Sequence, residues 1–479
     1  MKLQTLIGKS SLVSTSPFFR NNKDVFYLSF KALIAMGSVL ILLLPAIKNG
    51  YPLLYSDSAS YIYSGHEGIV PVDRPIVYGF IVRHISMSYS LWFVVILQAA
   101  IFVCLTWLSF KVLNRGERAC IYTLITCFLL GLFTGASNYI SQIMPDIFSA
   151  YMIWSLALIF VTKSRAHRWL LWAFTLISAL VHFSNILTIT VLAIIFILII
   201  VITHKREGIS KTITFQLIGL LILPWLLLPT INYAFQKEFF FNRSSSIFIT
   251  GRLIETGLLK KYLTEYTEAA KYDLYEYRDH LPEKIWQFVW NEDSPLYAGG
   301  CLDGGWVNCW LEKSDEYDNM IRSVLSKPPL FCQFLIISLQ DWFKQLLDFD
   351  IGHLTKQGES SIFKDMIARY FDDSPMYEKS DQFKGDLFFI KESAVQSYFV
   401  LLSVFLTIIF VLLSGKRRIK KEYLFVALVI VVGLLINALD SSMFSGVLNR
   451  YQGRIIWLIP MLAIWCSIRY FEKKGEVTN

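Results

Sequence analysis

Long apolar runs separated by short polar hinges dominate the chain and predict membrane-spanning helices. A helix needs about 20 apolar residues to cross a bilayer, and ten runs approach that length. They cover residues 28–47, 92–112, 120–133, 147–161, 169–181, 186–203, 213–230, 395–413, 423–436 and 455–470. We therefore expect an all-α polytopic membrane protein with about ten transmembrane helices.

The segment 234–391 interrupts these runs and differs from them in composition. It is rich in charged residues and in turn signals such as NEDSP and GGCLDGGW. We expect a mainly helical extracytoplasmic domain here, inserted between a membrane domain of seven spans (1–233) and a C-terminal membrane segment of three spans (392–479). Cys301 and Cys309 flank its glycine-rich turn, and their spacing permits a disulfide outside the cytoplasm.

Basic residues gather in the hinges between the apolar runs, for example in GKRRIKK. If the N-terminus lies in the cytoplasm, every hinge rich in Lys and Arg falls on the cytoplasmic side, as the positive-inside rule requires. We therefore expect both termini in the cytoplasm and a multi-pass protein of the inner (plasma) membrane. The net charge of +8 then reflects topology rather than nucleic-acid binding.

Composition supports this class and argues against others. Hydrophobic residues make up 54% of the chain, charged residues only 17%, and the mean hydropathy is +0.48, which a soluble domain rarely shows. The sequence has no GxxxxGK or GxGxxG phosphate cradle and no Cys/His spacing typical of zinc. A cytosolic nucleotide-dependent machine thus has no support. A divalent metal cofactor is compatible with the chain, although no ligand cluster requires one.

The first outside loop, residues 49–90, carries more chemistry than the other short loops. It combines Asp57, Asp73 and Arg74 with many aromatic residues, which makes it too polar for lipid and too aromatic for a solvated linker. The spans themselves are nearly free of charge, whereas a coupled transporter usually places carboxylates or broken helices near the midplane. The outer membrane surface is therefore the expected place of the chemistry.

Further polar candidates lie at the outer ends of other spans. Asp146 follows the third span, His182 follows the fifth, and Arg450 and Arg454 precede the last one in NRYQGRIIW. Arginine binds phosphate bidentately, and a hydroxyl that attacks an anomeric carbon must lose its proton to a positioned base such as a carboxylate. This combination predicts transfer of a sugar from a polyprenyl-phosphate donor.

Most of these residues also have a purely structural interpretation. Asp57 and Asp146 suit the N-cap position of a helix, since aspartate is a preferred cap. Arg74 could pair with Asp73 alone, which would contribute only about 0–1 kcal/mol on a surface. His182 could be a satisfied histidine at a helix end. The sequence leaves both interpretations open.

The layout resembles the GT-C class of integral-membrane glycosyltransferases, which use lipid-phosphate-linked sugars. The likeness rests on the early acid in YSDSASY, on the DRPIVYGFIV segment later in the same loop, and on NRYQGRIIWLIP before the last span. It implies a sugar transferase that acts on the extracytoplasmic face. On this interpretation we expect two catalytic residues (Asp57 and Asp146), three ligands of the donor phosphate (Arg74, Arg450 and Arg454) and two supporting residues (Asp73 and His182).

The favoured interpretation implies three partners: a polyprenyl-phosphate-sugar donor, a glycan or lipid acceptor and the lipid bilayer, without nucleic acid.

Two other functions stay open. A flippase or exporter of lipid-linked glycans would need a polar path through the bilayer, of which the apolar spans give little sign. An O-antigen polymerase or ligase would use a diphosphate-linked glycan and typically depends on histidine in a large outside loop. Here the first histidine of segment 234–391 is His280.

Overall fold

A computed structural model describes residues 17–112, 118–207, 211–298, 301–418 and 421–477 of the chain. The fold is 78% helical. In the described residues, the only sheet is a two-stranded antiparallel pair of β1 (His353–Leu354) and β2 (Leu387–Phe388). The predicted all-α fold class is thus confirmed in outline.

Long apolar helices indicate a multi-pass protein in a lipid bilayer. In the described part of the chain, six are long and apolar enough to span: α5 (Trp92–Val112), α10 (Phe183–Glu207), α11 (Lys211–Gln236), α20 (Ile390–Arg418), α21 (Lys421–Phe444) and the pair α22 (Asn449–Ile456) with α23 (Leu458–Val477). A seventh is added if α15 (Trp306–Leu325) and α16 (Pro328–Leu347), which meet at 95°, form one broken span.

The expected ten spans are not confirmed, because in four of the predicted spans the described apolar stretch is at most 16 residues long. These are the apolar part Leu28–Leu42 of α1 (Pro17–Leu42), then α6 (Ala119–Phe133), α8 (Asp146–Val161) and α9 (Arg165–Leu180). At a rise of about 1.5 Å per residue, a helix of about 16 residues is only about 24 Å long. The hydrocarbon core of a bilayer is about 30 Å thick.

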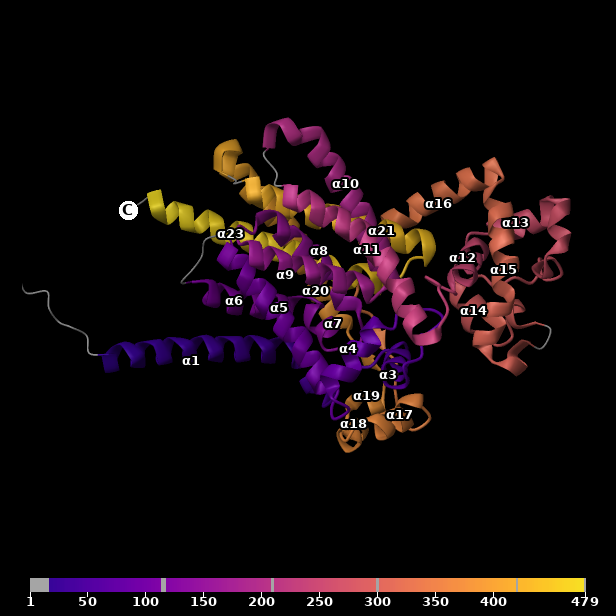
Figure 1. Ribbon diagram of the computed structural model, residues 1–479, viewed down its shortest axis with the longest axis horizontal. Helices are drawn as coiled ribbons and strands as arrows, with labels where there is room; N and C mark the ends of the chain where they lie inside the picture. The colour runs from indigo at the N-terminus through magenta and orange to yellow at the C-terminus, as the bar shows by residue number, and fades with distance from the viewer. Residues whose placement is uncertain (1–16, 113–117, 208–210, 299–300, 419–420, 478–479) are drawn as a thin grey trace, which may run out of the picture.

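Helix α8 lies at the centre of the bundle. All but one of its residues are buried, and it packs against α9, α21, α22 and α5, as its central position in Figure 1 shows. An apolar helix without a polar stripe can be buried among other helices as well as in lipid. Its first residue, Asp146, therefore enters the protein interior rather than the bilayer.

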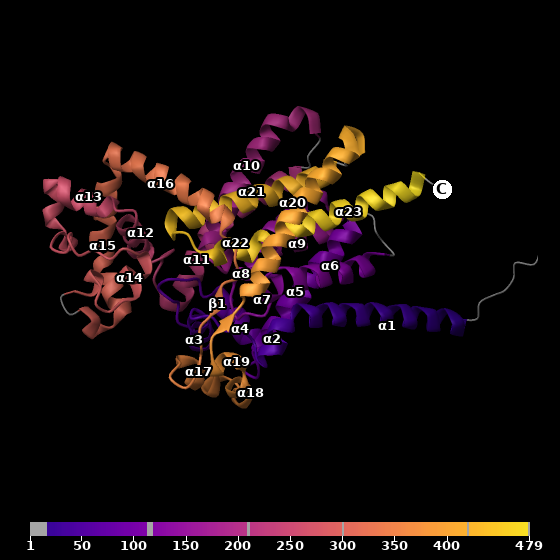
Figure 2. The ribbon, with the colours of Figure 1, turned by 180° about the vertical axis from the view of Figure 1, so that it is seen from behind.

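The segment 234–391, expected as one domain, divides its buried side chains between two clusters. The first has its own core and is built from α12 (Ser245–Glu255), α13 (Leu258–Glu265), α14 (Ile285–Trp290), α15 and α16. The disulfide between Cys301 and Cys309 belongs to this part. In Figures 1 and 2 it lies at the end of the molecule opposite the beginning of α1.

The second part packs on the main membrane core instead. It consists of α17 (Ile362–Tyr370), α18 (Ser374–Lys379) and α19 (Asp381–Lys384), and Phe363, Ile367 and Tyr377 contribute to that core. It lies beside α3 (Ser58–Glu67) of the first outside loop in both ribbon views. This loop is therefore covered in part by protein.

Candidate functional site

The loop 49–90 and the loop between α6 and α8 are joined at their backbones, and this brings the two predicted catalytic acids near one another along the bundle. After α2 (Leu44–Asn49), Leu53 forms an isolated parallel bridge with Gln142. The Leu53 amide donates to the Ser141 carbonyl at 2.8 Å, and the Ile143 amide donates to the Leu53 carbonyl at 2.9 Å. Asp57 and Asp146 each follow this bridge by a few residues.

Asp57 occupies the N-cap position of α3, but its side chain makes no capping hydrogen bond. Its carboxylate instead faces two arginines, with Arg74 Nη1 at 3.5 Å from Oδ1 and Arg450 Nη2 at 3.2 Å from Oδ2. The structural alternative, a carboxylate used up in capping, therefore does not describe Asp57. Its side chain is 24% exposed, which leaves it within reach of a ligand.

The position of Arg74 depends on a close crossing of α3 with α4 (Val77–Ser86). A Cβ atom on Gly65 would lie 2.0 Å from the Gly79 carbonyl oxygen, so only glycine fits. In the loop that joins the two helices, Arg74 is paired with Asp73 and donates to the Asp57 carbonyl oxygen at 3.2 Å. The pair with Asp73 thus holds Arg74 in place without removing it from Asp57.

Arg450 comes from the first turn of α22, 393 residues after Asp57 in the sequence. Its guanidinium carbon lies 4.5 Å from the ring centroid of Tyr55 and 5.5 Å from that of Tyr451. Cation–π contacts of this kind orient a guanidinium while leaving N–H groups free to donate. Arg450 is therefore fixed between two rings with its end directed at the first outside loop.

Arg454, one turn further along α22, forms a separate and fully buried ion pair. Its Nη1 lies 3.3 Å from Asp146 Oδ1, and the exposed fractions of the two side chains are 0% and 2%. Arg454 Nη2 also donates to Ser184 Oγ at 3.2 Å and to Asn437 Oδ1 at 3.1 Å. His182 completes this network, because its Nδ1 lies 2.8 Å from Ser184 Oγ.

Electrostatics give two titratable groups of the site, Asp57 and His182, defined charges. Burial raises the pKa of Asp57, but the attraction of Arg74 and then of Arg450 outweighs it, and the resulting pKa lies below the usual range. Asp57 is therefore ionised at neutral pH. Burial, helped by the nearby Arg454, lowers the pKa of His182 to about 3, so that this imidazole is neutral.

The structure joins every residue predicted for the site into one network. Arg450 and Arg454 connect its two halves, because they lie one turn apart on the same helix. The network contains all the predicted residues: Asp57, Asp73, Arg74, Asp146, His182, Arg450 and Arg454. Sequence reasoning missed Tyr55, Tyr139, Asn437 and Tyr451, which carry no signal of their own in a chain with 24 tyrosines.

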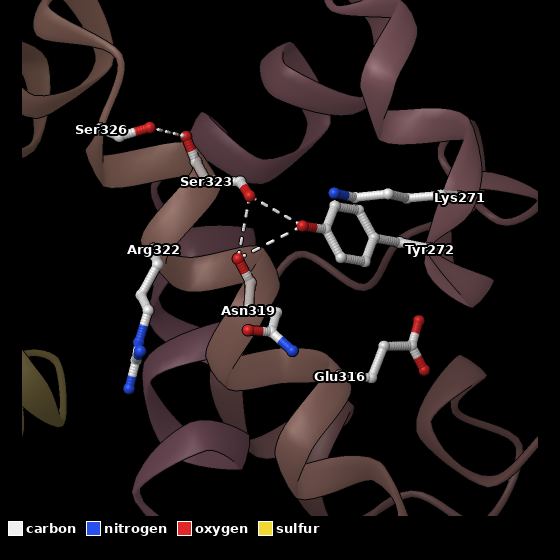
Figure 3. A pocket seen from close by; sticks show the side chains of 7 residues that line it. All are labelled: Lys271, Tyr272, Glu316, Asn319, Arg322, Ser323 and Ser326. Atoms are coloured by element: carbon white, nitrogen blue, oxygen red, sulfur yellow. Dashed lines mark hydrogen bonds between the residues drawn. The ribbon is translucent and has the colours of Figure 1, made fainter.

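A second polar feature lies outside this network, in the part built around α15. It is an open pocket of about 590 Å³ lined by Lys271, Tyr272, Glu316, Asn319, Arg322, Ser323 and Ser326, shown in Figure 3. The Tyr272 hydroxyl lies 2.8 Å from Ser323 Oγ and donates to the Asn319 carbonyl. Since these groups satisfy one another, the pocket gives no indication of a particular ligand.

The fold and the site together define a multi-pass helical membrane protein with a network of ion pairs at one end of its bundle. Within the described residues, no group of three or more His, Cys, Asp or Glu side chains gathers as a metal site would. No family model, curated protein or solved structure matches the chain. The function is accordingly argued from the site itself.

Proposed function

We propose that this protein is a membrane glycosyltransferase that moves a sugar from a polyprenyl-phosphate donor to a glycan or lipid acceptor on the extracytoplasmic side. The observation that carries the proposal is the ionised Asp57 carboxylate held between Arg74 and Arg450. All three side chains are partly exposed, at 24%, 12% and 18%. A candidate base, Asp57, and two candidate phosphate ligands, Arg74 and Arg450, thus lie together in a multi-pass membrane protein.

The reaction needs one carboxylate and a site for the phosphate. The oxygen of the acceptor hydroxyl forms a bond to the anomeric carbon of the donor sugar, and its proton passes to Asp57. The bond between that carbon and the phosphate oxygen breaks, and the electron pair leaves with the phosphate. Arg74 and Arg450 stabilise the added negative charge by charge-assisted hydrogen bonds. A phosphate leaves without a general acid, unlike the leaving alcohol in glycoside hydrolysis.

Binding of the donor would also activate the base. In the structure, both arginines attract the Asp57 carboxylate and lower its pKa, which makes it a weaker base. A phosphate that draws the two guanidinium groups toward itself reduces this attraction. The pKa of Asp57 then rises toward its ordinary range when the donor is in place. The base becomes stronger only when there is a substrate to act on.

Asp146 and Arg454 have a different place in this proposal from the one expected from sequence. Arg454 is inaccessible to solvent and is engaged by Asp146, Ser184 and Asn437. Leaving these partners for a phosphate would strand a buried carboxylate, which costs several kcal/mol. We therefore assign Arg454 to positioning Asp146 and α22, and not to the donor phosphate.

The test is transfer of a radiolabelled sugar by the purified protein in proteoliposomes that contain polyprenyl-phosphate-linked sugars. Asp57→Asn should lower kcat/KM by about 10²–10⁴-fold, the usual contribution of a general base. The control is Asp365→Asn, an exposed acid on α17 far along the chain from the network. Substantial transfer by a folded Asp57→Asn variant would contradict the proposal. Lipid translocation without any transfer would favour a flippase instead.

A further inference from the structure

Tyr139 belongs to the same network and lies in an unusual environment. It is part of α7 (Ala136–Ile140) in the second outside loop and is 2% exposed. Its hydroxyl lies so close to α22 that a Cβ atom on Gly453 would be 2.5 Å from the hydroxyl oxygen. Gly453 lies between Arg450 and Arg454 in the sequence and shares a helix face with Arg450. The hydroxyl is thus fixed at the junction of the two ion pairs.

Four polar atoms of Tyr139 and the two ion pairs are buried and lack a hydrogen-bond partner among the described residues: the Tyr139 hydroxyl, Arg450 Nε, Arg454 Nε and Asp146 Oδ2. Asp146 and both arginines of α22 act electrostatically on Tyr139, and Asp146 also attracts Arg450. Buried polar groups in proteins are nearly always paired, and each exception calls for an explanation. Elsewhere in the bundle, Tyr78 and Tyr151 both donate to Gln98.

The chemistry of these four atoms restricts the ligand that can satisfy them. The two arginine Nε atoms can only donate, the Asp146 carboxylate oxygen Oδ2 accepts, and the tyrosine hydroxyl can do either. A phosphate would satisfy the arginines but repel the carboxylate. A group that both donates and accepts can pair with donors and acceptor alike, and a hydroxyl is such a group. The junction therefore fits a hydroxyl-bearing ligand and does not fit a second phosphate.

We propose that Tyr139 and Asp146 bind a hydroxyl group of the transferred sugar, an inference that rests on the glycosyltransferase function proposed above. The more exposed Asp57 faces the acceptor, while Arg74 and Arg450 bind the phosphate. The sugar, which is attached to that phosphate, then lies on the inner side, toward the junction. The hydroxyl reaches Tyr139 once Arg450 leaves Asp57 for the phosphate. This pair would select the sugar that the protein accepts.

The substitution Tyr139→Phe tests this role because it removes only an unpartnered hydroxyl. Its thermal midpoint of unfolding should be no lower than that of the wild type, whereas kcat/KM for the accepted donor should fall about 10-fold, as for loss of one hydrogen bond to substrate. The matched control is Tyr151→Phe, whose hydroxyl donates to the Gln98 carbonyl at 2.7 Å. That variant should lose stability and keep its kcat/KM.

Deoxy analogues of the accepted donor separate a bound sugar hydroxyl from a bound water molecule. For the analogue that lacks the recognised hydroxyl, wild type and Tyr139→Phe should have equal kcat/KM. If wild type transfers sugar and Tyr139→Phe is equally active with every donor, the hydroxyl is satisfied by water and this inference is wrong. If wild type transfers no sugar from any polyprenyl-phosphate donor, the proposed function itself is wrong. The two failures are thus distinguishable.

Discussion

Two ion pairs, one turn apart on α22, use the same residue types in opposite ways. Arg450 meets Asp57 where both side chains are partly exposed, at 18% and 24%. Arg454 meets Asp146 where both are buried, at 0% and 2%. The outer pair, Arg450 with Asp57, can exchange a partner for a ligand. The inner pair, Arg454 with Asp146, cannot do so without a large free-energy cost, because a buried charge would be left unpaired. The two pairs thus differ in burial and not in residue type, and only the partly exposed pair is proposed to contact the donor phosphate and the acceptor.

The inner pair should account for the largest loss of stability. Arg454→Met leaves Asp146 buried without its cation, and such a change typically costs about 3–5 kcal/mol. The free energy of unfolding of the purified protein in micelles measures this loss. The double variant Arg454→Met with Asp146→Leu should recover most of it, because no charge stays unpaired. A single variant as stable as wild type would contradict a supporting role.

The outer pair should show the reverse behaviour. Arg450→Met removes one of two phosphate ligands, so kcat/KM for sugar transfer should fall about 100-fold, equivalent to about 2.7 kcal/mol of transition-state stabilisation. The free energy of unfolding should change by no more than about 1 kcal/mol, because the pair is partly solvated. Equal losses of stability at Arg450 and Arg454 would remove the distinction between the two pairs.

The crossing of α3 and α4 offers a way to disturb the outer pair from a distance. Gly65→Ala places a methyl group against the Gly79 carbonyl and should cost about 1–3 kcal/mol of stability, because the clash is with backbone. It should also reduce sugar transfer, since Arg74 lies in the loop that joins the two crossing helices. The control is Gly37→Ala in α1, where nothing lies within 4 Å of the added carbon. That change should be neutral or slightly stabilising.

The pH dependence of sugar transfer should also distinguish the two ion pairs. The folded pKa of Asp57 lies below its unfolded value, so its ionised form, and the stability it contributes, persist until the pH falls through that lowered pKa. The acid limb of kcat/KM, which reports the donor-free protein, should therefore lie below the usual carboxyl range. Arg450→Met should move this limb to higher pH, and Arg454→Met should move it less. An unmoved limb in Arg450→Met would argue against Asp57 as the base.

The sequence predicted a helical multi-pass membrane protein and the charged residues that form the network, but not their arrangement. Apolar runs identify helices, yet they do not separate a helix in lipid from one enclosed by protein. For this reason the apolar run 147–161 predicts a span, although it forms α8, which is buried almost throughout. The site candidates were visible because charges are rare near these spans. Arg450 and Arg454 look equivalent in NRYQGRII, and only the packing of α8, α21 and α22 makes one buried.

The proposed role of Tyr139 could not be predicted from the sequence. In its loop, NYISQIMPDIF, the acidic Asp146 is an obvious candidate for chemistry, whereas the tyrosine is not. The importance of its hydroxyl depends on Gly453, more than 300 positions later, and on the absence of a hydrogen-bond partner among the described residues. Such a relation is defined by the fold alone. Unpaired buried groups are therefore a useful guide to candidate sites.

The most direct test of the central claim is an experimental structure of the protein with a polyprenyl phosphate bound. We expect the phosphate within hydrogen-bonding distance of Arg74 and Arg450, with Arg454 still paired to Asp146. We also expect Arg450 to have moved away from Asp57. A phosphate bound to Arg454, or bound in the pocket of Tyr272 and Arg322 with the Asp57–Arg450 pair intact, would contradict the proposed site.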